Sequence, residues 1–272
     1  MEKKVRLDVL LVEKGRFSTR EKAKAAIMAG LVRVDGETVV KAGTKVPCHA
    51  KVEVDAPLHP YVSRGGLKLE KALRVFEFEM DGAVVVDVGA STGGFTDCAL
   101  QHGARHVYAV DVGYGQLAWK LRQDPRVTVM ERTNFRHVSP DAFRDPRPDV
   151  AVVDVSFISL DKILPVLKQV LPPHGDVLSL VKPQFEAGRN LVGKKGVVRD
   201  PSVHRSVLFD VFDAAESNGF HVLHLTYSPI TGGEGNIEFL VHWVKQDEPK
   251  LSDDDLRQLV EATVYRAHSH LY

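Results

Sequence analysis

Charged residues at the ends of predicted buried strands are the first candidates for chemistry in this sequence. Asp154 follows a strand-like run in DVAVVDV, and Lys182 ends the run DVLSLVK. Glu238 stands near the start of the last strand-like run, NIEFLVHWV, which is expected to run antiparallel, so its beginning lies at the same sheet edge as the other strands' ends. Charged residues seldom stand at the ends of buried strands without a function. These residues therefore predict one reactive crevice, which Lys68, from the helix-like segment before the first strand, would complete.

A glycine-rich turn supplies a second candidate site. Residues 84–100, VVVDVGASTGGFTDCAL, read as strand, tight turn and helix. Glycines let the backbone approach a ligand, and the turn directs a helix N-terminus at it. Ser91 stands where the dinucleotide fingerprint has its middle glycine, so a pyrophosphate is not the favoured ligand. The turn predicts binding of a nucleoside or phosphate, and a turn that only serves packing is the alternative.

The elements that must position these residues form an alternating series of strands and helices. Five strand-like runs, each followed by a helix or loop, predict a doubly wound parallel sheet. FHVLHLTYSP and NIEFLVHWV are separated only by a turn, which is too short for a parallel crossover, so they should pair antiparallel. Asp111 ends the second strand, 17 residues beyond Gly94, where a ribose-binding carboxylate is expected.

A smaller, basic domain precedes this sheet. Residues 1–62 contain 12 Lys and Arg against 8 Asp and Glu, although the whole chain of 272 residues has no net charge. Two short helical runs are followed by LVRVDGETVV, in which Asp35-Gly36 predicts a tight hairpin turn. We expect domains at 1–62 and 63–246 and an acidic C-terminal tail or helix at 247–272.

The chain resembles the TlyA family over nearly its whole length. RLDVLL and GLVRVDG are similar to the S4 RNA-binding domain, and DVGASTGGFTD, LVKPQFEAGR and SPITGGEGNIEFL are similar to FtsJ-like RNA ribose 2′-O-methyltransferases. The resemblance implies a Rossmann-like class I methyltransferase fold, with a parallel sheet and a terminal antiparallel strand, preceded by a small α+β S4 domain. It also implies S-adenosyl-L-methionine as cofactor and methylation of cytidine ribose 2′-hydroxyls in ribosomal RNA or ribosomal subunits.

The resemblance assigns roles to individual residues. Lys68, Asp154, Lys182 and Glu238 match the K-D-K-E catalytic tetrad of that family. Lys182 is the candidate base; the ammonium group of Lys68 would favour its uncharged form, and the two carboxylates would oppose it. The predicted cofactor-binding residues are Asp87, Gly89, Ser91, Gly93, Gly94, Phe95, Asp111 and Asn134. The predicted RNA-binding residues are Arg6, Arg16, Arg20, Lys22, Lys24, Arg33, Lys41, Arg189, Lys194, Lys195 and Arg199.

Composition argues against several other classes. No apolar run approaches the roughly 18 residues of a membrane span, and no signal peptide is evident, so we expect a cytoplasmic protein without a membrane partner. Cys48 and Cys98 have no paired spacing, and the 12 histidines show no metal-ligand spacing, so we expect no metal. No feature of the sequence indicates an oligomeric state.

Three rival functions stay open at this stage. Asp154 to Phe157, DVSF, distantly resembles the acidic-aromatic motif of base amino-methyltransferases, which stack a flipped base on the aromatic ring. A non-catalytic RNA-binding or ribosome assembly factor would use only the S4 domain. The haemolysin label carried by some TlyA members suggests a membrane-lytic protein, although no amphipathic basic helix supports it.

Overall fold

The computed structural model describes residues 4–17, 19–28, 30–54, 59–245 and 250–272, with only the backbone of Ala25, Lys194 and Gly233. Two compact units make up the chain, Met1–Pro60 and Tyr61–Tyr272. The division lies two residues before the predicted one. Residues 247–272, predicted as a separate tail or helix, fall within the second unit.

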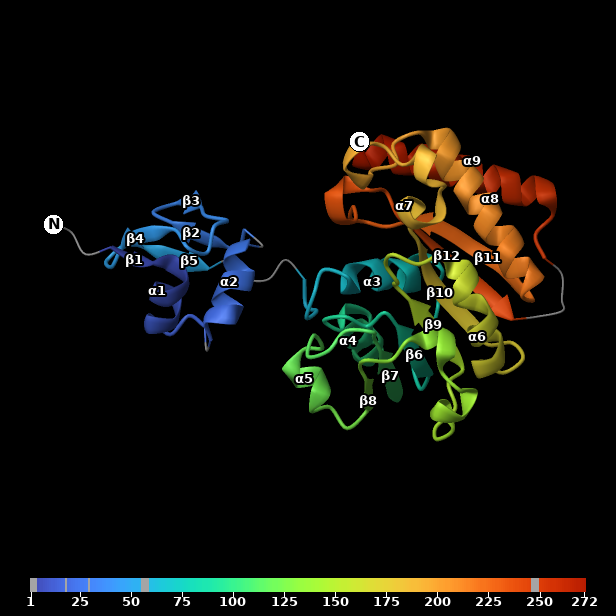
Figure 1. The fold of residues 1–272 in the computed structure, drawn as a ribbon, viewed down its shortest axis with the longest axis horizontal. Coiled ribbons are helices and arrows are strands. Elements are labelled where there is room, and N and C mark those ends of the chain that lie inside the picture. The colour runs from blue at the N-terminus through green and yellow to red at the C-terminus, as the bar shows by residue number, and fades with distance from the viewer. Residues whose placement is uncertain (1–3, 18, 29, 55–58, 246–249) are drawn as a thin grey trace. The chain divides into compact units, whose positions relative to one another are not determined.

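The first unit combines two helices with short antiparallel strands (Figure 1). Its elements are β1 (Lys4–Arg6), α1 (Leu7–Glu13), α2 (Arg20–Met28), β2 (Val32–Val34), β3 (Glu37–Thr38), β4 (Lys45–Pro47) and β5 (Val52–Val54). The predicted hairpin turn is confirmed: β2 and β3 pair around Asp35 and Gly36, whose φ angles of 53° and 88° suit a type I′ turn. Leu7, Leu11 and Ile27 from the helices bury against this hairpin, so the unit has its own core.

The second unit is built on a seven-stranded sheet of order β11-β12-β10-β9-β6-β7-β8 (Figure 1). Its strands are β6 (Val84–Val88), β7 (His106–Val110), β8 (Val127–Met130), β9 (Val150–Val153), β10 (Asp176–Val181), β11 (Phe220–Tyr227) and β12 (Phe239–Lys245). Strands β6 to β10 are parallel, and β12 runs antiparallel between β10 and β11. The predicted methyltransferase-type sheet is therefore confirmed.

Helices cover both faces of this sheet. They are α3 (Gly66–Val75), α4 (Gly94–Gln101), α5 (Trp119–Arg122), α6 (Leu164–Val170), α7 (Pro183–Glu186), α8 (Pro201–Ser217) and α9 (Asp253–Leu271). Alternate residues of β6 point to opposite faces: Val84 and Val86 belong to the core that also contains residues of α6, α8 and α9, whereas Val85 belongs to the core that contains residues of α3 and α4. A sheet buried on both faces explains why the run VVVDV is almost wholly apolar.

Two helices have features that the sequence does not predict. The helix that follows β9 begins as a 3₁₀ turn at Leu160–Lys162 and continues as α6. Helix α9 buries Val260, Val264 and Ala267 in the main core, so the acidic segment at 247–272 contains a helix that packs on the sheet domain. Its acidic residues occupy the first turn, where negative charge favours a helix N-terminus.

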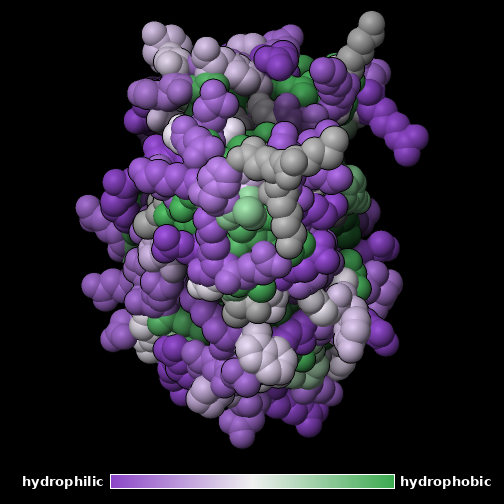
Figure 2. Space-filling model, turned by 90° about the vertical axis from the view of Figure 1, so that its left-hand side faces the viewer, coloured by the Kyte–Doolittle hydropathy of each residue, from purple (hydrophilic) through white to green (hydrophobic). Residues whose placement is uncertain are grey.

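No helix among the described residues is both long and apolar enough to cross a membrane. The face drawn in Figure 2 is mostly hydrophilic, with hydrophobic side chains in small separate patches.

Candidate active site

The structure brings the four predicted catalytic residues together at the carboxyl edge of the parallel strands. Asp154 and Lys182 directly follow β9 and β10, Glu238 directly precedes β12, and Lys68 lies in the first turn of α3. Lys68 Nζ donates to Glu238 Oε2 at 2.6 Å and lies 3.9 Å from Asp154 Oδ2. Lys182 Nζ lies 2.5 Å from Asp154 Oδ1 and donates to Ser156 Oγ at 3.0 Å. The side chains form a chain of alternating charge, Lys182, Asp154, Lys68, Glu238, which we call the tetrad.

Burial makes this alternation necessary. Lys68, Lys182 and Glu238 are 7%, 8% and 2% exposed. A buried charge is costly unless a partner of opposite sign accepts its hydrogen bonds. The two cations and two carboxylates of the tetrad balance one another, so the charges are held in place while the cluster stays neutral.

Two residues missed by the sequence interpretation hold the tetrad in position. Ser156 accepts a hydrogen bond from Lys182, two positions after Asp154 in the same loop. A Cβ on Gly232 would lie 2.1 Å from Glu238 Oε1, so only glycine leaves room for that carboxylate. The run TGGEGN contains this glycine, but its contact with Glu238 depends on tertiary packing.

The glycines of the turn between β6 and α4 lie close to neighbouring parts of the chain, and some of them also line a cavity. Gly89 has φ +87°, and a Cβ there would lie 2.6 Å from the Asp154 carbonyl oxygen. A Cβ on Gly93, at φ +99°, would lie 2.2 Å from Leu121 Cδ1. Gly89 and Gly93 therefore allow close packing of the turn, whether or not they also contact a ligand.

Two adjoining cavities lie along this edge. The larger, of about 380 Å³, includes Gly89, Ser91, Asp111, Asn134, Asp154, Val155, Ser156 and Phe157 in its lining. The smaller, of about 310 Å³, includes Ser63, Arg64, Lys68, Gly89, Ser91, Gly94, Phe95, Asp154, Ser156 and Lys182. The two share Gly89, Ser91, Asp154 and Ser156, so they meet beside the tetrad.

The predicted cofactor residues divide into those that line a cavity and those that do not. Asp111 accepts hydrogen bonds from Ser91 N at 2.8 Å and Gly113 N at 2.7 Å, which fixes its carboxylate at the wall of the larger cavity. The side chain of Asn134 accepts from Arg136 N at 3.2 Å and so caps a 3₁₀ turn there. Gly93 lines neither cavity, because it faces the leucines of the neighbouring loop and helix.

Asp87 also lies away from both cavities. Its side chain is fully buried and accepts from Thr96 Oγ1 at 2.6 Å, and Oδ1 has no hydrogen-bond partner within the described residues. Desolvation, with a smaller contribution from Asp154, raises the pKa of Asp87 to about 7. Asp87 is thus buried beneath the glycine turn and does not line either cavity.

In the first unit, two of the predicted RNA-binding arginines are held by one buried carboxylate. Arg6 donates to Asp8 through Nε at 2.9 Å and through Nη2 at 3.1 Å, and Arg20 Nη2 donates to Asp8 Oδ2 at 2.9 Å. Asp8 is fully buried, and the hydrogen bond from Arg6 is the main cause that holds its pKa well below its usual range. Sequence reasoning missed Asp8, which reads as a surface residue of an amphipathic helix.

The other predicted RNA-binding residues are distributed over both units. Exposed side chains belong to Arg16, Lys22, Lys41, Arg189, Lys195 and Arg199, and partly buried ones to Lys24 and Arg33. The Arg199 guanidinium carbon lies 5.3 Å from the ring centre of Tyr272, so this arginine contacts the C-terminal residue. The side chain of Lys194 lies outside the described part of the chain.

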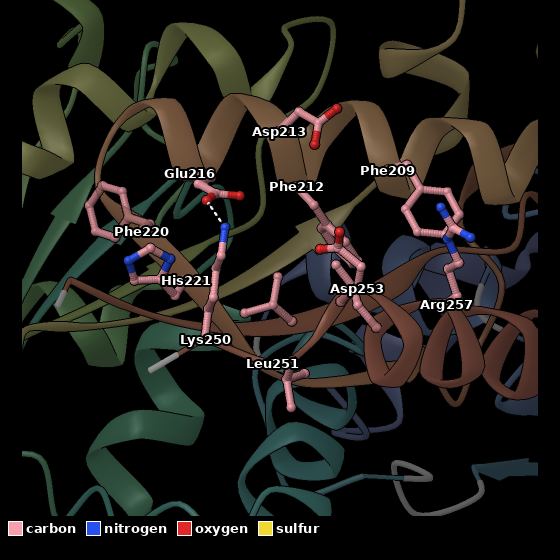
Figure 3. A pocket seen from close by; sticks show the side chains of 12 residues that line it. Phe209, Phe212, Asp213, Glu216, Phe220, His221, Lys250, Leu251, Asp253 and Arg257 are labelled. Atoms are coloured by element: carbon pink, nitrogen blue, oxygen red, sulfur yellow. Dashed lines mark hydrogen bonds and ion pairs between the residues drawn. The ribbon is translucent and has the colours of Figure 1, made fainter. Parts of the chain in front are cut away.

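A third cavity, of about 470 Å³, is unrelated to the tetrad (Figure 3). It lies between α8, α9 and the start of β11, and its lining includes Phe209, Phe212, Glu216, Phe220, Lys250 and Arg257. Because β11 begins at the opposite edge of the sheet from the tetrad, none of the predicted site residues lines it. No cluster of three or more His, Cys, Asp or Glu that could hold a metal occurs among the described residues.

Comparison with known proteins agrees with this architecture. The family model of the FtsJ-like methyltransferases matches residues 61–245, and that of the S4 domain matches residues 5–48. YqxC of Bacillus subtilis, described as a candidate rRNA methyltransferase, is 55% identical over 95% of this chain and 94% of its own length. The 16S/23S rRNA (cytidine-2′-O)-methyltransferase TlyA of Mycobacterium tuberculosis is 42% identical over 97% of this chain and 98% of its own.

A solved structure extends the likeness to three dimensions. A protein from Streptococcus thermophilus described as a candidate hemolysin shares 49% identity, with a TM-score of 0.79 over 99% of this chain and 98% of its own. The matched spans cover 95% to 99% of this chain and so extend over both units. The chain therefore belongs to the FtsJ-like methyltransferase family and, within it, to the TlyA family.

Proposed function

We propose that this protein is an S-adenosylmethionine-dependent methyltransferase that methylates the ribose 2′-oxygen of cytidine in ribosomal RNA. The observation that carries the proposal is the meeting of two cavities beside the tetrad, with Asp154 and Ser156 in the lining of both. A cofactor in the larger cavity and a ribose in the smaller one would meet next to Lys182. The names of the relatives from Mycobacterium tuberculosis and Bacillus subtilis support RNA as the substrate class.

The larger cavity fits the nucleoside part of this cofactor. Val88, Val110 and Ile158 offer an apolar wall for a purine. Asp111 would bind the ribose hydroxyls, because each carboxylate oxygen keeps a lone pair after accepting one backbone hydrogen bond. The cofactor, when bound, supplies a methyl group on a positively charged sulfur. The carboxylate of Asp154, at the junction of the cavities, suits that charge.

The tetrad would prepare the ribose hydroxyl for reaction. A hydroxyl is a poor nucleophile at neutral pH, so its proton must be removed or polarised while the oxygen is held in line with the methyl group. Lys182 Nζ donates to Ser156 Oγ and forms an ion pair with Asp154. In its uncharged form the amine has a lone pair that would accept the proton of the substrate hydroxyl. Lys68 shares Asp154 with Lys182 and pairs with Glu238, so it keeps the carboxylates fixed.

The first unit would supply RNA affinity. Arg6 and Arg20 are held by Asp8 yet remain 46% and 48% exposed, so their guanidinium groups are oriented before RNA arrives. Double-helical RNA is recognised mainly through phosphates, 2′-hydroxyls and shape. An array of fixed and mobile cations suits that mode of binding.

One rival function has a specific observation in its favour. Phe157 is 90% exposed, has φ +63°, lines the larger cavity and lies 4.9 Å from the ring centre of Phe185. Such a ring could stack a base and so present a base nitrogen for methylation. Base methylation, however, gives no role to Lys182, Lys68 and Glu238, which are buried together beside the junction.

The experiment that tests the proposal combines the protein with labelled S-adenosylmethionine and separated ribosomal subunits from a host that lacks the modification. The expected result is a label on a cytidine ribose, located by nucleoside analysis and mapping. A methyl group on a base nitrogen would establish the rival. No transfer to any RNA, with intact RNA binding, would instead support a non-catalytic factor, and dye release from liposomes by the protein alone would support a lytic one.

A further inference from the structure

A cluster of cations outside the tetrad surrounds Tyr227, the last residue of β11. Lys71 Nζ lies 3.5 Å from the centre of the Tyr227 ring. The imidazole of His270, on α9, stacks on the same Tyr227 ring, with centroids 5.9 Å apart at 17°, and its Nδ1 lies 3.2 Å from Tyr227 Oη. Arg74 follows Lys71 by three residues on α3, and Arg266 precedes His270 by four on α9, so each arginine lies one helical turn from a residue that contacts Tyr227. We call these five residues the Tyr227 cluster.

The three cations of the Tyr227 cluster, Lys71, Arg74 and Arg266, form no ion pair within the described residues, and Arg266 Nε donates to the carbonyl oxygen of Ala262 at 3.2 Å. Burial, followed by the charges of Arg74 and Arg266, lowers the pKa of Lys71 to about 8. Like charges gathered without an ion pair disfavour the folded state unless an anion joins them.

The Tyr227 cluster lies at the same edge of the sheet as the tetrad. Tyr227 pairs with Phe239, the neighbour of Glu238, and Ser228 N donates to the Glu238 carbonyl oxygen at 2.8 Å. Neighbouring strands are about 5 Å apart, so the end of β11 lies one strand beyond Glu238. On α3, Lys71 follows Lys68 by three residues and therefore shares its side of the helix.

The strand order also places the Tyr227 cluster opposite the cofactor turn. From one side of the sheet to the other the order is β11, β12, β10, β9, β6, so the tetrad separates the Tyr227 cluster from the glycine turn after β6. A polyanion whose reacting ribose occupies the smaller cavity would continue away from the cofactor toward β11. Exposed guanidinium groups of Arg74 and Arg266 match phosphate oxygens in charge and geometry.

We propose that the Tyr227 cluster binds backbone phosphates of the RNA substrate next to the nucleotide held at the tetrad. This inference rests on the proposed function for the identity of the polyanion. It adds a binding surface, built from α3, β11 and α9, to the basic residues of the first unit and of the loop 189–199. The C-terminal helix α9 thereby gains a direct role in substrate binding.

The test compares Arg74→Gln/Arg266→Gln with Arg105→Gln/Arg257→Gln. Both pairs remove two exposed arginines, but Arg105 precedes β7 and Arg257 lines the third cavity, so the control pair lies away from the catalytic edge. Binding is measured by fluorescence anisotropy of a labelled ribosomal RNA transcript over a range of salt concentrations. Thermal unfolding and cofactor binding by calorimetry check that each variant is intact.

We expect the cluster variant to bind RNA about tenfold more weakly and to lower the slope of log affinity against log salt by about 0.7 to 0.9 per lost phosphate contact. The control variant should retain the wild-type affinity and slope. An unchanged slope in the cluster variant, or an equal loss in both variants, would overturn the inference. Absence of methyl transfer to any RNA by the wild type would refute the proposed function, whereas the binding comparison would still decide the role of the Tyr227 cluster.

Discussion

At the scale of single residues, Asp87 links the cofactor turn to the stability of the fold. Its pKa of about 7 lies above the ordinary value of 3.8, so between these pH values the folded chain holds a proton that the unfolded chain has lost. This contribution to stability is complete below about pH 4 and is lost as the pH rises toward 7. Its expected slope is about 1.4 kcal/mol per pH unit.

The variant Asp87→Asn should remove this slope, because an amide does not titrate. Urea unfolding of the wild type and the variant at pH 5 and pH 7 measures the difference. The variant should gain stability relative to the wild type as the pH rises. Parallel pH dependence in the two proteins would show that Asp87 is not protonated in the folded state.

Asp8 is the second residue whose environment gives a prediction. In Asp8→Asn the carboxylate that holds Arg6 and Arg20 becomes a neutral amide, so the two arginines lose their charge-assisted hydrogen bonds. RNA affinity should fall about tenfold, since each such bond is worth more than a neutral one. The carboxylate also has a lowered pKa, so its contribution to stability is present above the unfolded pKa and is lost at strongly acidic pH.

Anisotropy measurements with an RNA transcript at neutral pH test this variant. Glu13→Gln is a matched control, because Glu13 is an exposed acid on the same helix. Loss of affinity in the control as well would indicate a general effect of charge on α1.

At the scale of elements, the positions of the tetrad residues were predictable from the strand pattern. Polar residues that directly follow buried parallel strands all lie at the same edge of the sheet. Asp154 and Lys182 were found from this rule. Ser156 and Gly232 were not, because their roles depend on the approach of another chain segment. The packing of α9 also escaped prediction, since its acidic start hides the buried stripe of Val260 and Val264.

The loop before β12 offers a prediction at this scale. Gly232→Ala introduces a Cβ that would lie 2.1 Å from Glu238 Oε1, and the carboxylate must move away from Lys68. A displacement of this size should lower the turnover rate by about 100-fold while the protein stays folded. In Gly188→Ala, by contrast, the new methyl group meets only the end of the Asn190 side chain.

The turnover rate of each variant is measured with saturating RNA and cofactor, and circular dichroism checks that each variant is folded. Together these measurements separate a loss of catalysis from a loss of structure. Wild-type turnover in Gly232→Ala would mean that Glu238 tolerates displacement and is not needed at its observed position.

At the scale of the whole molecule, the chain is two compact units with separate cores. The core of Met1–Pro60 contains residues such as Leu11 and Val32, whereas the cores of Tyr61–Tyr272 lie on the two faces of the large sheet. The basic composition of the front segment led to a predicted boundary after residue 62. The boundary differed by two residues, because Tyr61 buries against the second unit and donates to Glu70 at 2.8 Å.

Separate cores predict separate unfolding transitions. S-adenosylmethionine at about 100 times its dissociation constant should stabilise only the second unit, by about 2.7 kcal/mol. Differential scanning calorimetry with and without the cofactor measures this. One transition that shifts as a whole would show that the two units unfold together.

The central claim is that the tetrad carries methyl transfer to a ribose hydroxyl, and Lys182 tests it most directly. The measurement is the single-turnover rate of transfer from labelled S-adenosylmethionine to ribosomal RNA by wild type and Lys182→Ala, with cofactor and RNA binding measured in parallel. We predict unchanged binding and a rate lowered by about 100-fold or more. Transfer at the wild-type rate in Lys182→Ala would contradict the claim and remove Lys182 from the reaction.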